Sequence, residues 1–450
     1  MRAPTDPGGH AGRRRSLPRR AVPLTVLVLL ATCSQLAAQA IPTSGRFALF
    51  TSWSQRQWDD GSNRDFTEVI GNLSFYTKER PGDIFEFGLD TRYATYPSSE
   101  REDRVSLYEA YVGVHTRNRA FNLRVGQMWL HELGGIGSVG GLFAEYRQPG
   151  STSLGRWRFG LFAGYELALY ELEYLPDIEK GGVYAALDGA HGRKHVLGYV
   201  RIRNQGLTER SVVVFNNFIP IGRSFTAYQG LEYDIEGPGG LGSSELSYFF
   251  VNLRYRFSKV VDLQGTYHRG RSLDARTITE DVINGRPVDP AVLDGLLYES
   301  GRVRLNVRPL RFLSLWATYG ADRNNRTDDT STRFNLGLSG RRLFGTPLDF
   351  TLSSARTDRG QDSYDSLWAS LGYSIGPKVY VSFDYRDSLS VFHVADGDGG
   401  VIEIRPNSKL YSVTSNINLS RTFSLLITLQ MLKQTDFEER WVLTGLVIRF

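Results

Sequence analysis

The chain from Gly45 onward is built of short segments in which apolar side chains alternate with polar or small ones. In residues 249–257 the apolar positions are Phe249, Val251, Leu253, Tyr255 and Phe257, and the opposing positions include Asn252, Arg254 and Arg256. Side chains on a β-strand point alternately to opposite faces, so each segment predicts a strand with one apolar and one polar face. The chain holds about 22 such segments, and no apolar run beyond the first 40 residues is long enough for a transmembrane helix.

The connections between these segments differ in length in a regular way. Every second connection is short, namely residues 78–83, 116–120, 258–259, 309–311, 374–378 and 420–422. Several of the others read as long and hydrophilic, namely residues 54–65, 269–300, 321–330 and 387–409. Alternation of tight turns and long loops is typical of an antiparallel sheet that crosses a membrane, with the turns on the periplasmic side.

The two faces of the strands favour a closed barrel over a sandwich. The polar faces carry Arg, Asp, Glu and Asn, which pack into a second apolar layer only at a high desolvation cost. Backbone groups in lipid must all be paired, and closure of the sheet removes its edges. The sequence therefore predicts an all-β, antiparallel up-and-down transmembrane barrel of about 22 strands, within a range of 18–24. A secreted β-sandwich remains open, since alternation alone permits it.

The positive charge of the protein is confined to its first 40 residues. The formal net charge is +5, and residues 1–40 hold six arginines against the single acid Asp6. The remaining residues contain 47 basic and 47 acidic side chains and carry no net charge. A nucleic-acid partner is therefore not expected, because it would need a basic surface on the folded part of the chain.

The same 40 residues have the order of a secretory signal peptide. Arginines precede the apolar stretch 21–33, and Ala38-Gln39-Ala40 follows as a cleavage site. Two alternatives remain: the segment is an uncleaved signal anchor, or the protein is a lipoprotein that is modified at Cys33. We expect residues 1–40 to be cleaved after export and residues 41–450 to form a single barrel domain. Cleavage would remove the only cysteine, so the barrel is expected to have no disulfide.

The last segment carries a resemblance to a known class of proteins. Residues 441–450 alternate, with Leu446, Ile448 and the terminal Phe450 on one face. This end resembles the C-terminal β-signal of Gram-negative outer-membrane proteins, and residues 107–114 and 123–127 resemble paired strands of porin-like proteins. The resemblance implies an outer-membrane location, contact with outer-membrane lipid, and recognition by the barrel-assembly machinery. It identifies no particular porin family. The first strand begins too close to the cleavage site for an N-terminal plug domain.

Arginines are expected to form a stripe on one part of the lumen wall. If three successive segments pair, two arginine-bearing strands flank a strand that carries Asp262 and His268. The arginines of this basic stripe are Arg254, Arg256, Arg302, Arg304 and Arg308. Arg201 and Arg203 are also expected to face the lumen. Either such charges pair across strands in a water-filled lumen, or the stripe attracts anions.

The longest connection, residues 269–300, is expected to be an outer loop beside this stripe. Asp289 and Pro290 have the order of a helix N-cap and first helical position, and the turn runs to Asp294. A loop with a short helix can fold inward and narrow a wide lumen, or lie on the surface. We take this loop as the candidate constriction.

The sequence contains no arrangement of residues that indicates catalysis. The histidines are scattered, and no zinc-protease, nucleophile-elbow or phosphate-loop motif is present. We therefore expect no enzyme activity, no metal and no cofactor. The function that fits best is a porin-like channel for passive diffusion of small hydrophilic solutes, and a preference for anions follows only if the charges of the basic stripe stay unpaired. The alternative is a scaffolding barrel whose lumen holds a periplasmic or surface protein, and the sequence leaves a homo-oligomer open.

Overall fold

The computed structural model describes residues 43–78, 82–168, 172–241, 244–395 and 400–450. The predicted signal peptide, residues 1–40, lies outside the described residues. The first strand begins at Thr43, close to the predicted cleavage site.

Strands make up most of the described chain. They are β1 (Thr43–Trp58), β2 (Asn63–Thr77), β3 (Phe85–Thr95), β4 (Arg104–His115), β5 (Phe121–Trp129), β6 (Ser138–Arg147), β7 (Arg156–Leu167), β8 (Tyr174–Asp188), β9 (Lys194–Asn204), β10 (Leu207–Ile221), β11 (Phe225–Glu236) and β12 (Glu245–Arg256). The second half adds β13 (Val261–Ser272), β14 (Leu296–Leu310), β15 (Leu313–Asn324), β16 (Thr327–Gly340), β17 (Leu348–Arg359), β18 (Asp362–Ile375), β19 (Val379–Ala395), β20 (Val401–Ile404), β21 (Asn407–Asn418), β22 (Phe423–Gln434) and β23 (Phe437–Arg449).

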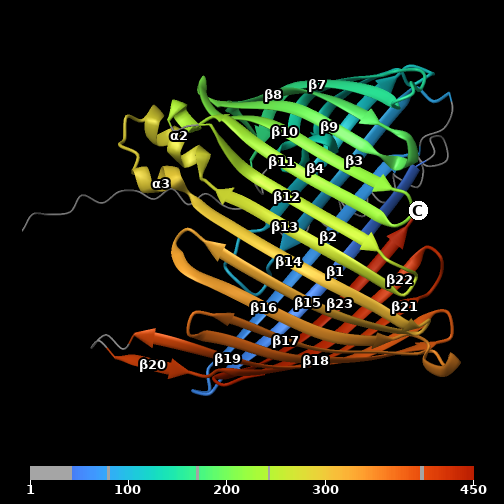
Figure 1. Ribbon diagram of the computed structural model, residues 1–450, viewed down its shortest axis with the longest axis vertical. Coiled ribbons are helices and arrows are strands. Elements are labelled where there is room, and N and C mark those ends of the chain that lie inside the picture. The colour runs from blue at the N-terminus through green and yellow to red at the C-terminus, as the bar shows by residue number, and fades with distance from the viewer. Residues whose placement is uncertain (1–42, 79–81, 169–171, 242–243, 396–399) are drawn as a thin grey trace, which may run out of the picture. The chain divides into compact units, whose positions relative to one another are not determined.

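These strands form a closed antiparallel barrel (Figure 1). Each strand pairs with its neighbour in the chain, except that β19 pairs with both β21 and the short β20. The barrel closes where β1 pairs with β23. It therefore has 22 strands, with β20 as an addition at one end, which confirms the predicted fold class and strand number.

The helical segments are few and short. They are η1 (His131–Ile136), η2 (Ala190–Gly192), η3 (Pro238–Gly240), α2 (Ala275–Ile283), α3 (Pro290–Asp294) and η4 (Leu343–Gly345). No helix in the described ranges is long and apolar enough to cross a membrane. In Figure 1, α2 and α3 lie at the end of the barrel opposite the C-terminus, and we call this end the outer mouth.

The seam between β1 and β23 places the last residue of the chain against the first strand. The backbone N–H of Gly45 donates to the carbonyl of Phe450 at 2.9 Å, and the N–H of Phe450 donates to the carbonyl of Gly45 at 3.1 Å. The ring of Phe450 covers Gly45, where a Cβ would collide with it. Ile448 and Leu446 pair with Phe47 and Leu49. The candidate assembly signal is thus one side of the closing strand pair.

Several connections predicted as long loops are in fact paired strands. Residues 54–65 and 321–330 belong largely to β1, β2, β15 and β16, which are joined by tight turns, and much of residues 387–409 is strand in β19, β20 and β21. The predicted alternation of short and long connections is therefore wrong for these segments. These residues are polar because they pair beyond the apolar band, where a strand needs no apolar face.

The predicted orientation of the strand faces is confirmed over most of the barrel. Leu253 and Val303 face outward and are 42% and 50% exposed. Arg254 and Asp262 alternate with such outward positions and therefore face the lumen. A closed barrel with an apolar outer face and a polar interior is the architecture of outer-membrane proteins, as predicted.

The expectation that Arg201 and Arg203 line the lumen is wrong. In β9 the buried residues Val196 and Val200 point inward, and Leu197, which is 55% exposed, points outward. Arg201 and Arg203 lie four and six positions after Leu197 in the same strand and therefore share its outward face. Because β9 has apolar residues on both faces, its sequence does not show which of them meets lipid.

Candidate functional site: the lumen and its outer mouth

One connection folds inside the barrel. The inner loop, residues 130–137, joins β5 to β6 and contains η1. Its Leu133 is 0% exposed and lies against Gly198 of β9, where a Cβ would collide with the leucine side chain. The amide of Asn216 in β10 donates to the carbonyl of Glu132 at 2.9 Å. The loop is therefore held on the inner wall by an apolar contact and a hydrogen bond.

The inner wall beneath this loop is apolar, unlike the rest of the lumen. Buried residues from the inner loop and from β5–β10 form one cluster, which includes Leu130, Leu133, Ile136, Phe143, Phe162, Val196, Val200, Val212 and Val214. The alternation of apolar and polar residues did not predict an apolar interior here. The inner loop packs on the part of this wall formed by β8–β10, and its burial is favourable by about 25 cal/mol per Å² of apolar surface.

A charged network joins the inner loop to the barrel wall. Arg158 of β7 bonds to Asp188 at 2.7 Å, to Glu132 of the loop at 2.8 Å and to Glu145 at 3.0 Å. The hydroxyl of Tyr184 also donates to Glu145. One guanidinium thus holds three carboxylates from three different segments, which fixes the loop to β6, β7 and β8.

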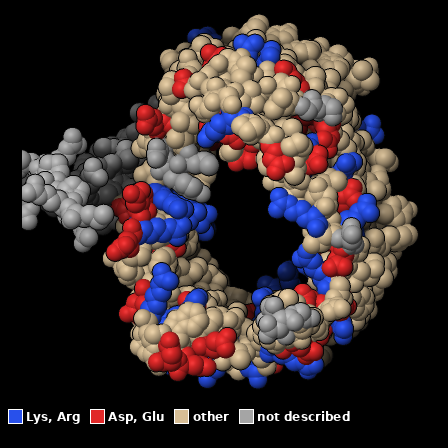
Figure 2. Space-filling model, turned by 90° about the vertical axis from the view of Figure 1, so that its left-hand side faces the viewer, with Lys and Arg blue, Asp and Glu red and all other residues tan. Residues whose placement is uncertain are grey.

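The rest of the lumen is open. Figure 2, a view into the outer mouth, shows a central opening into which Lys and Arg side chains project from two sides. In this view no globular domain formed by the described residues fills the barrel. Because the inner loop covers the wall of β6–β10, the opening is bordered by the polar wall of the other strands.

The basic stripe forms on three adjacent strands, as the sequence predicted. β12 pairs with β13 and β13 with β14. Gln264 lies between Arg254 and Arg304, and Thr266 lies opposite Arg302 on the same inward face. Arg254 and Arg304 are therefore two strand spacings apart, about 9.6 Å.

Asp262 neutralises part of the stripe. It is 3% exposed and accepts hydrogen bonds from Arg254 at 3.3 Å, Arg308 at 3.2 Å and Asn306 at 3.0 Å. Two of the five arginines of the stripe therefore contact this carboxylate. The stripe therefore retains a positive charge after the pairing is counted.

The other members of the stripe lack an acidic partner within the described ranges. Arg304 donates to Asn306 at 2.8 Å and lies over the ring of Trp316, 5.4 Å from its centroid. No ion pair is formed by Arg256 or Arg302 with any described residue. Their charge is exposed to whatever occupies the lumen.

His268 is not part of this charged group. It faces the lumen nearer the outer mouth, and its ring lies 5.4 Å from the ring of Tyr248 and 5.9 Å from that of Tyr298. The structure therefore places His268 on the same strand as Asp262 but in an aromatic setting.

The predicted helical turn in the long outer loop is present as α3. Asp289 caps it by accepting from the N–H of Ala291 at 2.8 Å, and Pro290 is its first residue. The guanidinium of Arg271 donates to the carbonyl of Asp294 at 2.7 Å. The loop that carries these residues spans 273–295 and lies at the outer mouth (Figure 1), whereas Leu133 of the inner loop reaches Gly198 in the middle of β9. Whether the outer loop limits the opening stays a prediction.

The helix α2 in the same loop was missed. Asp274 caps it, and Ile278 and Val282 follow at helical spacing, a signal that could have found it. Arg276 reaches Glu166 of β7 at 2.9 Å and Glu209 of β10 at 3.3 Å. Because Glu166 lies on the inward face of β7, α2 covers part of the outer mouth on its inner side.

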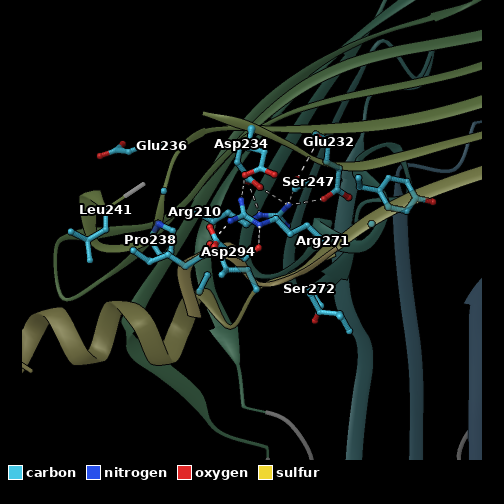
Figure 3. Close-up of a pocket in the computed structure, with 18 of the residues that line it drawn as sticks. Arg210, Glu232, Asp234, Glu236, Pro238, Leu241, Ser247, Arg271, Ser272 and Asp294 are labelled. Atoms are coloured by element: carbon cyan, nitrogen blue, oxygen red, sulfur yellow. Dashed lines mark hydrogen bonds and ion pairs between the residues drawn. The ribbon is translucent and has the colours of Figure 1, made fainter. Parts of the chain in front are cut away.

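A cavity of about 720 Å³ lies between α3, η3 and the wall of β10–β14. Figure 3 shows Arg210 and Arg271 at its centre, with carboxylates around them. Arg210 pairs with Asp234 at 2.8 Å and Glu232 at 3.0 Å, and Arg271 pairs with Glu245. The lining of this cavity therefore holds more carboxylates than arginines, in contrast to the basic stripe on β12–β14.

Comparisons with known proteins identify the fold and no family. Neither a family model nor a curated protein matches the chain. The solved structures it resembles include Acinetobacter baumannii OccAB4, at 12% identity and a TM-score of 0.42 over 91% of this chain and 98% of that one. Pseudomonas aeruginosa OpdQ matches at 10% identity and a TM-score of 0.44 over 91% of this chain and 99% of that one. An E. coli P pilus tip assembly intermediate, PapC-PapD-PapK-PapG, matches at 11% identity and a TM-score of 0.50 over 90% of this chain and 61% of that one. At these identities the last match supports the outer-membrane barrel fold alone.

Proposed function

We propose that the protein is a porin-like channel through which small hydrophilic solutes diffuse passively, with a preference for anions. The observation that carries the proposal is an open lumen (Figure 2) together with a basic stripe in which only Arg254 and Arg308 contact a described carboxylate, that of Asp262. Stripes of fixed charge on a pore wall raise the local concentration of ions of opposite sign. We propose no catalytic role for any residue of the lumen.

The position of the inner loop supports a narrowed channel rather than a wide hole. Residues 130–137 cover the apolar wall of β6–β10 and are tied down by Arg158. We propose that this loop, and not the outer loop with α3, sets the narrowest part of the opening. The outer loop then shapes the entrance, where α2 is anchored through Arg276.

The experiment that tests the anion preference removes the charge and keeps the size of the side chains. Replacing Arg254, Arg256, Arg302 and Arg304 by Gln should move the reversal potential in a KCl gradient toward the cation side. Arg356→Gln is the matched control, since Arg356 lies on the outward face of β17 and is bonded to Asp358. An unchanged reversal potential in the fourfold variant, or an equal shift in the control, contradicts the proposal.

A further inference from the structure

The two outward-facing arginines of β9 belong to a regular pattern of paired residues on the outer face of β6–β10. One row of paired residues is entirely apolar except for a tyrosine hydroxyl: Ala144, Leu161, Val183, Tyr199 and Val213. The next row toward the outer mouth is Leu142, Ala163, Gly181, Arg201 and Ser211. The row after it includes Tyr165, Glu179 and Arg203. Arg201 therefore lies where the apolar band gives way to polar residues.

Small side chains make a hollow beside these arginines. Ala163 and Gly181 leave space between the larger residues of the neighbouring rows, and the resulting outer hollow measures about 910 Å³. Its border includes Tyr165, Arg201 and Arg203. A second, apolar hollow of about 650 Å³ adjoins it farther from the outer mouth and shares Leu161, Val183 and Tyr199 with it.

The arginines keep hydrogen-bonding capacity that the protein does not use. Arg201 donates to the hydroxyl of Thr208 at 2.8 Å and lies 3.7 Å from Glu236. Its Nε is buried and has no hydrogen-bond partner among the described residues. No ion pair links Arg203 to another described residue, although Glu179 lies opposite it in the strand register.

We infer that the outer hollow binds one phosphate-bearing membrane lipid. The phosphate would lie between Arg201 and Arg203, whose guanidinium groups suit bidentate contact with phosphate oxygens. An acyl chain would follow the apolar hollow along Leu161 and Val183. Glu179 at the rim adds a carboxylate that suits an ammonium or a bound cation next to the phosphate.

The position along the barrel supports a lipid over a soluble ligand. The hollow opens on the lipid-facing side, and its apolar part continues into the band that contacts hydrocarbon. Tyr165 and Tyr199 flank the arginines at the level where aromatic residues commonly meet headgroups. The phosphate can come from a glycerophospholipid or from lipid A, and both share the chemistry of the site.

The test uses the refolded barrel in detergent and measures lipid adducts by native mass spectrometry. The probes are phosphatidylglycerol, phosphatidylethanolamine, lipid A and, as a lipid without phosphate, diacylglycerol. We expect one retained phosphate lipid for the unmodified protein and about a tenfold or larger loss for the double variant Arg201→Gln, Arg203→Gln. The lipid that is retained most strongly identifies the source of the phosphate.

A second variant separates binding from folding. A Cβ on Gly181 would meet only the carbonyl oxygen of Phe162, at 3.4 Å, so Gly181→Leu fits the strand and fills the hollow. It should lower lipid retention while heat-dependent gel mobility stays that of the folded barrel. Arg323→Gln is the control, since Arg323 is an arginine paired with Glu299 on the outer face of β14–β15.

Five results would overturn the inference, and four of them concern lipid retention. They are unchanged retention in the double variant, unchanged retention in Gly181→Leu, an equal loss in Arg323→Gln, and equal retention of diacylglycerol. A dimer that Gly181→Leu dissociates in the absence of lipid would also overturn it, because the hollow would then be a contact between two copies of the chain. None of these measurements depends on whether the barrel conducts ions.

Discussion

Loosening the inner loop tests whether it narrows the channel, and Leu133→Ala is the most direct change. Leu133 is fully buried against β9, with Gly198 beneath it. Truncation of a fully buried leucine to alanine costs about 2–5 kcal/mol. That cost shifts the balance between the docked and the undocked loop by about 30- to 5,000-fold toward the undocked state. The contacts that remain, through Glu132 and Asn216, are worth about 1–3 kcal/mol each.

The assay is single-channel recording of the refolded variant in a planar bilayer. We expect a larger mean conductance and more open-channel noise, because the loop leaves the wall part of the time and widens the passage. Leu142→Ala is the control, since Leu142 is 57% exposed on the outward face of β6. If Leu133→Ala conducts with the amplitude and noise of Leu142→Ala, the inner loop does not limit the channel.

Four further predictions concern stability and assembly. Arg158→Gln leaves three carboxylates without their shared cation, which should cost about 3–5 kcal/mol and lower the temperature at which the barrel loses its folded gel mobility. Asp274→Ala removes the N-cap of α2, which should destabilise the helix by about 1 kcal/mol and speed proteolysis of the outer loop. Hydrogen bonds from the backbone and hydroxyl of Thr277 lower the pKa of Asp274. In the native protein the cap should therefore persist as the pH falls through the ordinary aspartate range and be lost only below that range. The same proteolysis assay, repeated across this pH range, measures the loss. Phe450→Ala removes the ring that covers Gly45 at the seam and should slow assembly of the barrel into membranes, measured by the appearance of the folded band.

The alternating segments predicted the fold well because a barrel between lipid and water imposes that pattern. In residues 249–257 the polar and apolar faces were assigned correctly, and Arg254 lies across Gln264 from Arg304 as expected. The same logic failed for β9, where Val196 and Leu197 are both apolar. One faces an internal core and the other faces lipid, and alternation cannot distinguish them.

The inner loop shows a second limit of sequence reasoning. Residues 130–137 combine three glycines with Leu130, Leu133 and Ile136, and this short segment has no strand or helix period that would show where its apolar side chains pack. Its burial depends on Gly198 and Asn216, which lie far along the chain. The outer loop was the opposite case, since the local capping of α3 by Asp289 is visible in the sequence.

The central claim is that the lumen is an open passage whose fixed charge favours anions. The measurement that tests it most directly is the current carried by the refolded, unmodified barrel in a planar bilayer under a KCl gradient. The account predicts steady openings and a reversal potential on the chloride side. An absence of current from protein shown to be folded by its gel mobility would contradict the claim and favour a barrel filled by a partner. A reversal potential on the potassium side would contradict the role of the basic stripe.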